Sequence, residues 1–361
     1  MKKIVTILGA RPQFIKGAVL SRIISEKNEF EEIIIHTGQH FDKNMSNIFF
    51  EEMHIPKPKY NLDINGLSHG AMTGRMIESI EKILLDEKPE IVVVFGDTNS
   101  TLAGALAAKK IGIKVAHIEA GLRSFNMSMP EEVNRILTDR ISNLLSCPTQ
   151  KAIDNLREEG FVNFDIEIYK HGDIMKDAME FYKKKSKDYS NVLEKLSIKG
   201  SKFVLATIHR QENTESATVL SEIFEALGTI NKKQPVVLPL HPRTAGRLKE
   251  YKIETDVVVI EPQGYYDMIQ LLENCTMVIT DSGGLQKEAF FNKKQCIVVR
   301  EETEWVELVE KGYAKIVGAN KKNILNTFKE FLNSNVKYDE GLYGKNVGEQ
   351  IYLSIKKIIN K

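Results

Sequence analysis

The sequence predicts an α/β protein with two doubly wound domains, each built on a parallel sheet. Short apolar runs rich in β-branched residues alternate with longer amphipathic stretches, as strands alternate with covering helices in parallel sheets. This pattern gives way to a Lys-rich helical stretch at 174–202 and then restarts. The length of 361 residues also favours two domains over one.

The first domain is expected to span residues 1–172. Its strands are predicted in the runs KIVTIL (3–8), EEIIIHTG (31–38), EIVVVFGD (90–97), KVAHIEA (114–120) and LLSCPT (144–149). Helices are expected to begin near Phe14, Asn44, Gly70, Ser100 and Glu131. The second domain is expected to span residues 173–345, with strands in KFVLATIHR, QPVVLPLHP, DVVVIEP, MVITDSGG, QCIVVR and AKIVG.

Composition and charge argue against several classes of function. A formal net charge of +1 gives no electrostatic footprint for nucleic acid or an anionic membrane. The first apolar run is too short for a signal peptide because Arg11 and Pro12 follow at once, and no run of about 18 apolar residues predicts a membrane span. Cys147, Cys275 and Cys296 have neither metal-ligand nor CxxC spacing, which favours a reducing, cytoplasmic setting.

Polar residues gather where the predicted strands end, which is where open α/β sheets bind their ligands. These groups lie at 9–11, 38–40, 96–98, 119–123, 209–213, 241–243 and 281–284. We expect the carboxyl ends of the strands to form the functional site.

The run MVITDSGGLQKEAF predicts a strand, a tight turn and a helix. Gly283 and Gly284 would let backbone amides approach a ligand closely, and the helix N-terminus would favour an anion such as a diphosphate. Glu288, one turn into the helix, would accept hydrogen bonds from ribose hydroxyls. The alternative is an ordinary N-cap formed by Asp281 or Ser282. The run matches neither the GxGxxG fingerprint nor a P-loop.

The run LGARPQFIK likewise predicts a strand, a turn and a helix start at Pro12. Arg11 would stand at the mouth of that helix and bind phosphate oxygens, unless it pairs with a structural carboxylate. Lys16, on the same helix, would face the same edge of the sheet.

Four carboxylates form the most informative set. Asp97 and Glu119 end adjacent apolar runs. Glu131 and Glu132 follow Pro130 at a helix start, where the helix dipole alone explains one of them. Acids crowded together raise one another's pKa, which suits proton transfer near neutral pH.

Two histidines follow strands in the second half. His209 precedes Arg210, and His241 lies two residues before Arg243. Cations and donors at these places fit a phosphorylated ligand. No HxxxH or HxH spacing supports a metal site, so no metal is expected.

Taken together, the runs GARPQFIK, TGQH, GDTNSTLAGALAA, HIEAGLRS, PEEVNR, HRQEN and DSGGLQKEA resemble the non-hydrolysing UDP-N-acetylglucosamine 2-epimerases, in family order and over nearly the whole chain. The resemblance implies the GT-B architecture of two Rossmann-like domains facing a central cleft, with the last helix at 346–361 packing back on the first domain. It also implies inversion at C2 of a UDP-linked 2-acetamido sugar, by elimination and re-addition of UDP, in a homodimer without a cofactor.

By motif match, the resemblance makes Asp97, Glu119 and Glu131 the acid/base residues. It makes His209 the residue that stabilises the departing diphosphate. It assigns substrate binding to Arg11, Lys16, Gln263, Ser282, Gly283, Gly284 and Glu288. Among these, Gln263 matches the uracil side and Glu288 the ribose.

Departures from the common motifs point to a subgroup. ETEWVE places Trp305 where the family has an arginine near the sugar. FDKNM, with Asp42, replaces residues of the pocket that binds a second UDP-N-acetylglucosamine in bacterial members, so no allosteric activation by that sugar nucleotide is expected. LPLHPRT replaces an asparagine-rich segment. These features resemble enzymes that epimerise UDP-2,3-diacetamido-2,3-dideoxyglucuronic acid to its manno isomer for surface polysaccharides.

Other functions stay open at this point. One is a UDP-N-acetylglucosamine 2-epimerase, and another is a relative that hydrolyses the glycal intermediate. A glycosyltransferase of the same architecture and a nucleotide-sugar sensor complete the set. The four carboxylates argue against the last two functions. A transferase needs a site for an acceptor, and a sensor needs only the residues that bind the phosphates.

Overall fold

The structure is a computed structural model that describes residues 1–39 and 56–361. The helix expected near Asn44 and the residues His40 and Asp42 lie outside the described residues. Within the described part of the chain, no helix is long and apolar enough to cross a membrane.

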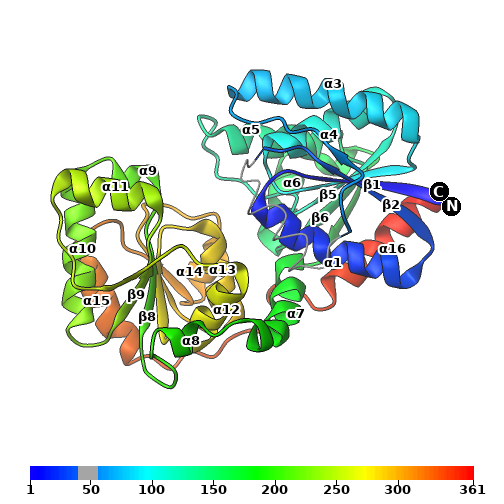
Figure 1. Cartoon of the computed structure of the whole chain (residues 1–361). Coiled ribbons are helices and arrows are strands. Elements are labelled where there is room, and N and C mark those ends of the chain that lie inside the picture. Colours follow the sequence, from blue (N-terminus) through cyan, green and yellow to red (C-terminus); the bar gives the residue numbers. More distant parts are fainter. Residues whose placement is uncertain (40–55) are drawn as a thin grey trace. The chain divides into compact units, whose positions relative to one another are not determined.

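Two compact units make up the described chain. Unit 1 consists of Met1–Ala178 and Gly341–Lys361, and unit 2 consists of Met179–Glu340. The division lies within one continuous helix, α7 (Ile174–Tyr189). The last helix, α16 (Val347–Asn360), belongs to unit 1 (Figure 1).

In its described residues, unit 1 contains a seven-stranded sheet in the order β3-β2-β1-β4-β5-β6-β7, with parallel neighbours. The strands are β1 (Lys2–Leu8), β2 (Phe30–His36), β3 (Tyr60–Asn61), β4 (Ile91–Phe95), β5 (Lys114–Ile118), β6 (Leu144–Cys147) and β7 (Glu167–Lys170). The helices besides α7 and α16 are α1 (Arg11–Lys27), α3 (His69–Glu87), α4 (Asn99–Lys110), α5 (Pro130–Ile141), α6 (Gln150–Glu158) and the 3-10 helix η1 (Phe161–Asn163). The strand order reverses between β1 and β4, which is the switch point where doubly wound sheets bind ligands.

Helices cover both faces of this sheet. Helices α3, α4 and α5 lie on one face, and α1 and α16 lie on the other (Figure 1). In the first of these layers, Val92 and Val94 on β4 pack in one apolar cluster with Met76 and Ile80 on α3. The prediction of a doubly wound sheet with buried central strands is therefore confirmed. The edge strands β3 and β7 escaped sequence prediction because they are short and only half-buried.

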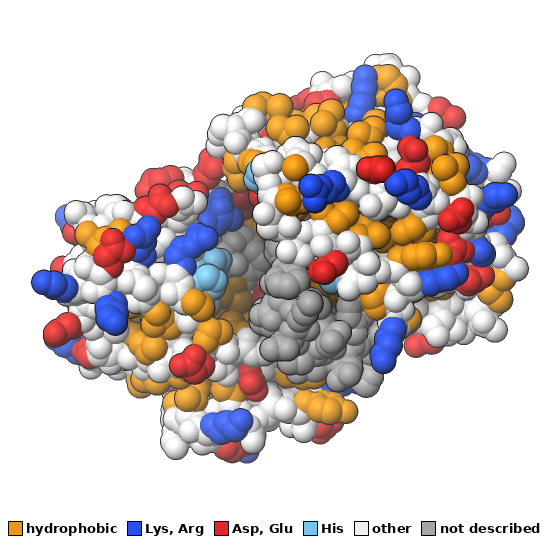
Figure 2. Space-filling model, turned by 45° about the horizontal axis from the view of Figure 1, so that its top comes forward, with side chains coloured by type: hydrophobic (Ala, Val, Ile, Leu, Met, Phe, Trp, Pro, Cys, Tyr) orange, Lys and Arg blue, Asp and Glu red, His pale blue; other side chains and the backbone are white. Residues whose placement is uncertain are grey.

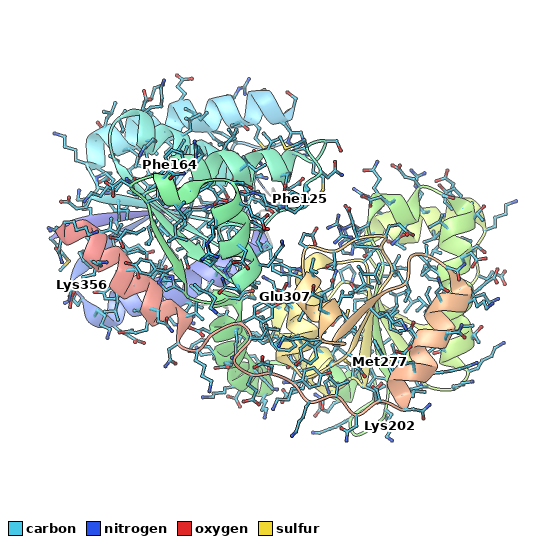
Figure 3. All side chains as sticks on the ribbon, turned by 180° about the vertical axis from the view of Figure 1, so that it is seen from behind. Phe125, Phe164, Lys202, Met277, Glu307 and Lys356 are labelled. Atoms are coloured by element: carbon cyan, nitrogen blue, oxygen red, sulfur yellow. The ribbon has the colours of Figure 1, made fainter. Side chains whose placement is uncertain are left out.

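Helix α16 completes the second layer. Its residues Ile351, Tyr352 and Ile355 are buried, and the Lys114 ammonium on β5 donates to the carbonyl of Ile358 at 2.6 Å. Lys356 lies on the outer side of the helix (Figure 3). The last helix is therefore an integral part of unit 1.

Two glycines let the outgoing and returning segments of unit 1 pack against one another. Gly172 (φ 106°) and Gly344 (φ 76°) both have left-handed backbone conformations. A Cβ on Gly172 would lie 2.2 Å from the carbonyl oxygen of Tyr343, and one on Gly344 would lie 2.4 Å from that of His171. The backbone N–H of Asp173 donates to the Tyr343 carbonyl at 3.0 Å. Only glycine fits at the two crossing positions.

Unit 2 repeats the plan, with a six-stranded parallel sheet in the order β10-β9-β8-β11-β12-β13 among its described residues. The strands are β8 (Val204–Thr207), β9 (Val236–Pro239), β10 (Val258–Ile260), β11 (Met277–Thr280), β12 (Cys296–Val298) and β13 (Ala314–Ile316). The helices are α8 (Val192–Lys195), α9 (Gln211–Thr214), α10 (Ala217–Asn231), α11 (Pro242–Tyr251), α12 (Tyr265–Asn274), α13 (Gly283–Phe291), α14 (Val306–Glu310) and α15 (Lys321–Leu332). Helices α10 and α15 pack together on one face, and α12 and α13 lie over the other (Figure 1). The switch point of this sheet lies between β8 and β11.

Candidate functional site

The turn between β1 and α1 is built around Gln13. Its Oε1 accepts a hydrogen bond from the backbone N–H of Gly9 at 2.8 Å, and its amide donates to the carbonyl of Phe95 at 2.7 Å. A Cβ on Gly9 would lie 2.1 Å from Ser100 Oγ, so the turn requires glycine there. These contacts fasten the start of α1, where Arg11 is the first residue, to the end of β4.

Lys16 on α1 forms an ion pair with Glu119, the residue that follows β5. Both side chains are nearly buried. Glu119 has a left-handed backbone conformation (φ 72°), which is uncommon for a residue other than glycine and is often found at functional positions. The structure therefore joins two residues that the sequence assigned separately to substrate binding and to proton transfer.

Asp97, two residues after the end of β4, forms an ion pair with Arg135 on α5. Its backbone carbonyl accepts a hydrogen bond from the Asn134 amide at 2.9 Å. The Asp97 side chain keeps 34% of its surface exposed, whereas that of Arg135 keeps 6%. Two consecutive residues of α5 thus hold Asp97 while part of its carboxylate stays accessible.

The two glutamates at the start of α5 have different surroundings. Glu132 is fully buried, and it accepts the backbone N–H groups of Ser124 at 3.0 Å and Phe125 at 2.9 Å. Burial by itself would raise the pKa of Glu132, but these two N–H groups and the Arg135 charge hold it below its ordinary value. Glu131 is exposed. Glu132 therefore has structural partners in the preceding loop and in Arg135, whereas Glu131 is the member of the pair that is exposed.

A buried network beneath these residues was missed by the sequence reasoning. His117 on β5 contacts Asp139 on α5 through Nδ1 at 2.7 Å and the carbonyl of Gly96 through Nε2 at 2.7 Å. The Arg123 guanidinium donates to Asp139 at 2.7 Å. Burial would raise the pKa of Asp139, but His117 and Arg123 together lower it. The available signal was a histidine inside the apolar run KVAHIEA, because a buried polar group requires a partner.

In unit 2, Asp281 organises the turn after β8. It is fully buried, and it accepts the backbone N–H groups of His209 and Arg210, each at 2.9 Å, and the Asn213 amide at 3.1 Å. The His209 Nδ1 lies 3.2 Å from an Asp281 oxygen, and 40% of the histidine side chain is exposed. Asp281 is therefore the anchor that holds His209 at this edge of the sheet.

Helix α13 begins at the carboxyl end of β11. Ser282 is its N-cap, and the Ser282 hydroxyl accepts the Leu285 N–H at 3.5 Å. The N–H groups of Gly283 and Gly284 belong to the first turn, whose amides have no partner within the helix. A Cβ on Gly284 would meet no described atom within 4 Å, so the space beside it is open. This arrangement suits an anion. Glu288 lies one turn further on and is partly exposed.

Trp305 packs against the start of α13. It is 6% exposed, its indole N–H donates to the carbonyl of Gly283 at 3.0 Å, and the Lys287 ammonium lies 3.8 Å from the ring centre. Arg300 pairs with Glu304 at 3.1 Å beside them. Trp305 therefore braces the first turn of α13, and it brings no charge to the position where the family motif has an arginine.

Positive charge gathers at the same edge of unit 2. The rings of His209 and His241 lie 5.8 Å apart. Burial, followed by the charges of His209 and Arg243, lowers the pKa of His241. Figure 2 shows histidine side chains on the surface beside Lys and Arg side chains.

Gln263 lies in the turn between β10 and α12, where its amide donates to the carbonyl of Glu261 at 2.6 Å.

The two units offer different chemistry. Unit 1 supplies carboxylates at the ends of β4 and β5, and each has a cation beside it. Such carboxylates are suited to proton transfer. Unit 2 supplies helix amides, histidines and arginines, which are groups that bind an anion. Within residues 1–39 and 56–361, no group of three His, Cys, Asp or Glu side chains would hold a metal ion.

Known proteins resemble this chain over nearly its full length. A profile described as UDP-N-acetylglucosamine 2-epimerase matches residues 22–356. The UDP-2,3-diacetamido-2,3-dideoxy-D-glucuronate 2-epimerase of Pseudomonas aeruginosa is 53% identical over 343 residues, which cover 95% of this chain and 96% of that one. A UDP-N-acetylglucosamine 2-epimerase of Methanococcus maripaludis is 43% identical over 97% of each chain. The Methanocaldococcus jannaschii UDP-GlcNAc 2-epimerase, crystallised with UDP-GlcNAc and UDP, is 41% identical with a TM-score of 0.88, over 98% of this chain and 99% of that one.

Proposed function

The chain belongs to the UDP-N-acetylglucosamine 2-epimerase family, and we propose that it is an isomerase that inverts C2 of a UDP-linked 2-acetamido sugar. The observation that carries the proposal is the placement of Asp97 and Glu119 after the neighbouring strands β4 and β5, each paired with a cation. Inversion at C2 requires one group that takes a proton and one that returns a proton to the opposite face. Two carboxylates held separately in one unit suit this task.

The proposed reaction is an elimination followed by re-addition. A carboxylate takes the C2 proton, the C1–O bond to UDP breaks with its electron pair, and a 1,2-unsaturated sugar and UDP form. A second group returns a proton to the other face of C2 while UDP adds back to C1, so nothing is consumed. Asp97, Glu119 and Glu131 are the proposed acid/base residues, and His209 stabilises the negative charge that develops on UDP.

The nucleotide is held by groups of unit 2 in this proposal. Ser282, Gly283 and Gly284 bind the diphosphate at the start of α13, because first-turn amides and the helix dipole both favour an anion. Glu288 binds the ribose and Gln263 the uracil side. Arg11 and Lys16 are the proposed substrate-binding residues of unit 1.

The proposed substrate is UDP-2,3-diacetamido-2,3-dideoxyglucuronic acid, with UDP-N-acetylglucosamine as the alternative. Support comes first from identity, which is 53% to the relative named for the uronate, 49% to one named as a UDP-N-acetylglucosamine 2-epimerase homolog and 43% to one named as a UDP-N-acetylglucosamine 2-epimerase. The C5 carboxylate adds a negative charge that needs a cation. Arg243 is exposed beside His241, and Arg210 helps Arg300 lower the pKa of Glu304 against its burial. Arg210 and Arg243 are the candidate partners of that carboxylate.

Nuclear magnetic resonance in deuterated water tests this function. Each of the two UDP sugars is incubated with the enzyme, and the C2 signal is followed to equilibrium. The proposal expects solvent deuterium at C2 of both isomers with UDP still attached. Release of a free sugar and UDP would instead identify a hydrolysing enzyme. Turnover of UDP-N-acetylglucosamine without any turnover of the uronate would contradict the proposed substrate. It would still agree with the proposed 2-epimerase activity.

A pair of variants tests the recognition of the C5 carboxylate. Arg243→Gln and Arg210→Gln are compared for KM with both UDP sugars. Loss of a charged hydrogen bond should raise KM for the uronate about tenfold or more, with a much smaller effect on UDP-N-acetylglucosamine. Equal changes with both sugars would show that the arginine serves the diphosphate.

The setting that we propose is the cytoplasm, where the product would enter surface polysaccharide or glycan synthesis. The family resemblance favours a homodimer. Light scattering on the purified protein tests this, since a mass of two chains supports it and a mass of one chain contradicts it.

A further inference from the structure

The structure connects Asp97 to two residues to which the motif resemblance gave no role, Arg135 and Glu132. The Arg135 Nη2 pairs with Asp97 Oδ2, and Nη1 lies 2.6 Å from Glu132 Oε2. The planar fork of a guanidinium permits both bonds at once. Arg135 therefore fixes the position of a partly exposed carboxylate relative to a buried one.

Glu132 is the fixed end of this chain of contacts. Its Oε1 accepts the Phe125 N–H at 2.9 Å, and its Oε2 accepts the Ser124 N–H at 3.0 Å in addition to the bond from Arg135. Phe125 lies in the loop that precedes α5 (Figure 3). Because Glu132 is fully buried and has three donors, its carboxylate has little freedom to move. Asp97 is the accessible end of this chain of contacts, because Arg135 holds its Oδ2 and about a third of its side chain is exposed.

The second acid of the site has a different kind of partner. Glu119 pairs with the ammonium of Lys16, whereas Asp97 pairs with the guanidinium of Arg135. A planar guanidinium fork fixes the orientation of its carboxylate partner more firmly than a rotatable ammonium does. The two pairs share one turn, because a Cβ on Gly96 would lie 3.6 Å from Glu119 Oε2 and 3.9 Å from Lys16 Nζ. Asp97, the residue after Gly96, and Glu119 are therefore neighbouring acids with different kinds of cation beside them.

We propose that Arg135, anchored by Glu132, is a positioning residue that holds Asp97 in one orientation, so that Asp97 can exchange a proton with C2 of the sugar. Glu119, with Lys16, is then the acid/base pair for the other face. Exchange with water restores both groups after turnover. The inference rests on the proposed 2-epimerase function, which it deepens by giving the two acids different tasks.

Substitution of Arg135 tests the assignment. Arg135→Gln removes the charge and keeps some of the volume, and it should lower kcat about a hundredfold, as expected for a misplaced acid/base residue. KM and the Kd for UDP should stay within about threefold of the wild type, since the nucleotide is bound by other residues. Arg135→Lys restores the charge without the fork, and its kcat should lie between those of Arg135→Gln and the wild type.

Arg123 offers a matched control. It is as buried as Arg135, at 7% against 5% exposed, and it also lies between two carboxylates, Asp139 and Glu159. Arg123→Gln should lower Tm at least as much as Arg135→Gln does, because it too leaves a buried acid without its cation. Its kcat should fall far less than that of Arg135→Gln does, because Arg123 binds Asp139 and Glu159 and reaches the turn before Asp97 indirectly, through Asp139 and His117.

Several outcomes would overturn the proposal. They are a wild-type kcat in Arg135→Gln, equal losses of kcat in the Arg135 and Arg123 variants, and a loss of kcat that merely follows a loss of UDP binding. If Arg135→Gln does not fold, Arg135→Lys decides, because a raised KM with unchanged kcat contradicts a positioning role. A wild-type enzyme that places no solvent deuterium at C2 would reject the proposed function itself.

Discussion

Gly284→Ala should change stability and nucleotide affinity in opposite directions. Gly284 is the second residue of α13, and a Cβ there would meet no described atom within 4 Å. Replacing glycine by alanine in a helix reduces the freedom of the unfolded chain and stabilises the fold by about 0.5–1 kcal/mol. The unliganded variant should therefore have a slightly higher Tm than the wild type.

The same methyl group should weaken UDP binding. If the diphosphate lies against the first-turn amides, a Cβ in the open space prevents its close approach. Losing one hydrogen bond between an amide and a charged phosphate costs about 1.5–3 kcal/mol. Since about 1.4 kcal/mol corresponds to a factor of ten, Kd for UDP should rise about tenfold to a hundredfold. Gly284→Val should have a larger effect on Kd.

Calorimetry with UDP and thermal unfolding without it measure the two effects. Gly74→Ala is the matched control, because Gly74 lies within α3 and its Cβ would likewise meet no described atom within 4 Å. It should raise Tm and leave Kd unchanged. Wild-type affinity in a folded Gly284→Ala variant would refute the reasoning, because the diphosphate would then not lie on this helix.

Two further predictions concern stability. Burial raises the pKa of Glu32, so the folded state favours the neutral acid and loses stability as pH rises from the unfolded value of about 4.3 through the folded pKa. Urea unfolding should therefore show Glu32→Gln to be more stable than the wild type at pH 7, and this advantage should disappear below about pH 4. Glu31→Gln, at an exposed position, should change stability little. Equal behaviour of the two variants would contradict this reasoning. Gly172→Ala should destabilise unit 1 by at least about 2 kcal/mol, because its Cβ would lie 2.2 Å from the Tyr343 carbonyl oxygen. Gly200→Ala is the control, because Gly200 has φ 75° but its Cβ would meet no described atom within 4 Å, so only the backbone penalty applies. An equal loss of stability in both variants would show that Gly172 and the Tyr343 carbonyl do not pack tightly.

The placement of the two central acids followed from local pattern. β4 and β5 are continuous apolar runs, so Asp97 and Glu119 had to come after buried strands. Parallel neighbours bring such ends to one edge of a sheet, and the two strands are neighbours in the structure. The sequence therefore predicted the edge at which the acids lie.

The partners of these acids did not follow from the sequence. Arg135 and Asp97 are 38 residues apart, and no local pattern specifies which cation meets which carboxylate. Glu131 and Glu132 are the same residue type at consecutive positions of the first turn of α5, and the loop before α5 directs its N–H groups to Glu132. The division between the units lies inside α7. The sequence does not reveal this position, because the periodicity of a helix is the same on both sides of the point where it passes from one core to another.

The return of α16 to unit 1 sets an order of folding during synthesis. Residues 179–340 are complete before 341–361 are made, and domains fold as units while the chain emerges. Until α16 arrives, the surfaces of α1 and β6 against which it packs remain uncovered. Unit 2 can therefore close its core before unit 1 does, although most of unit 1 precedes unit 2 along the chain.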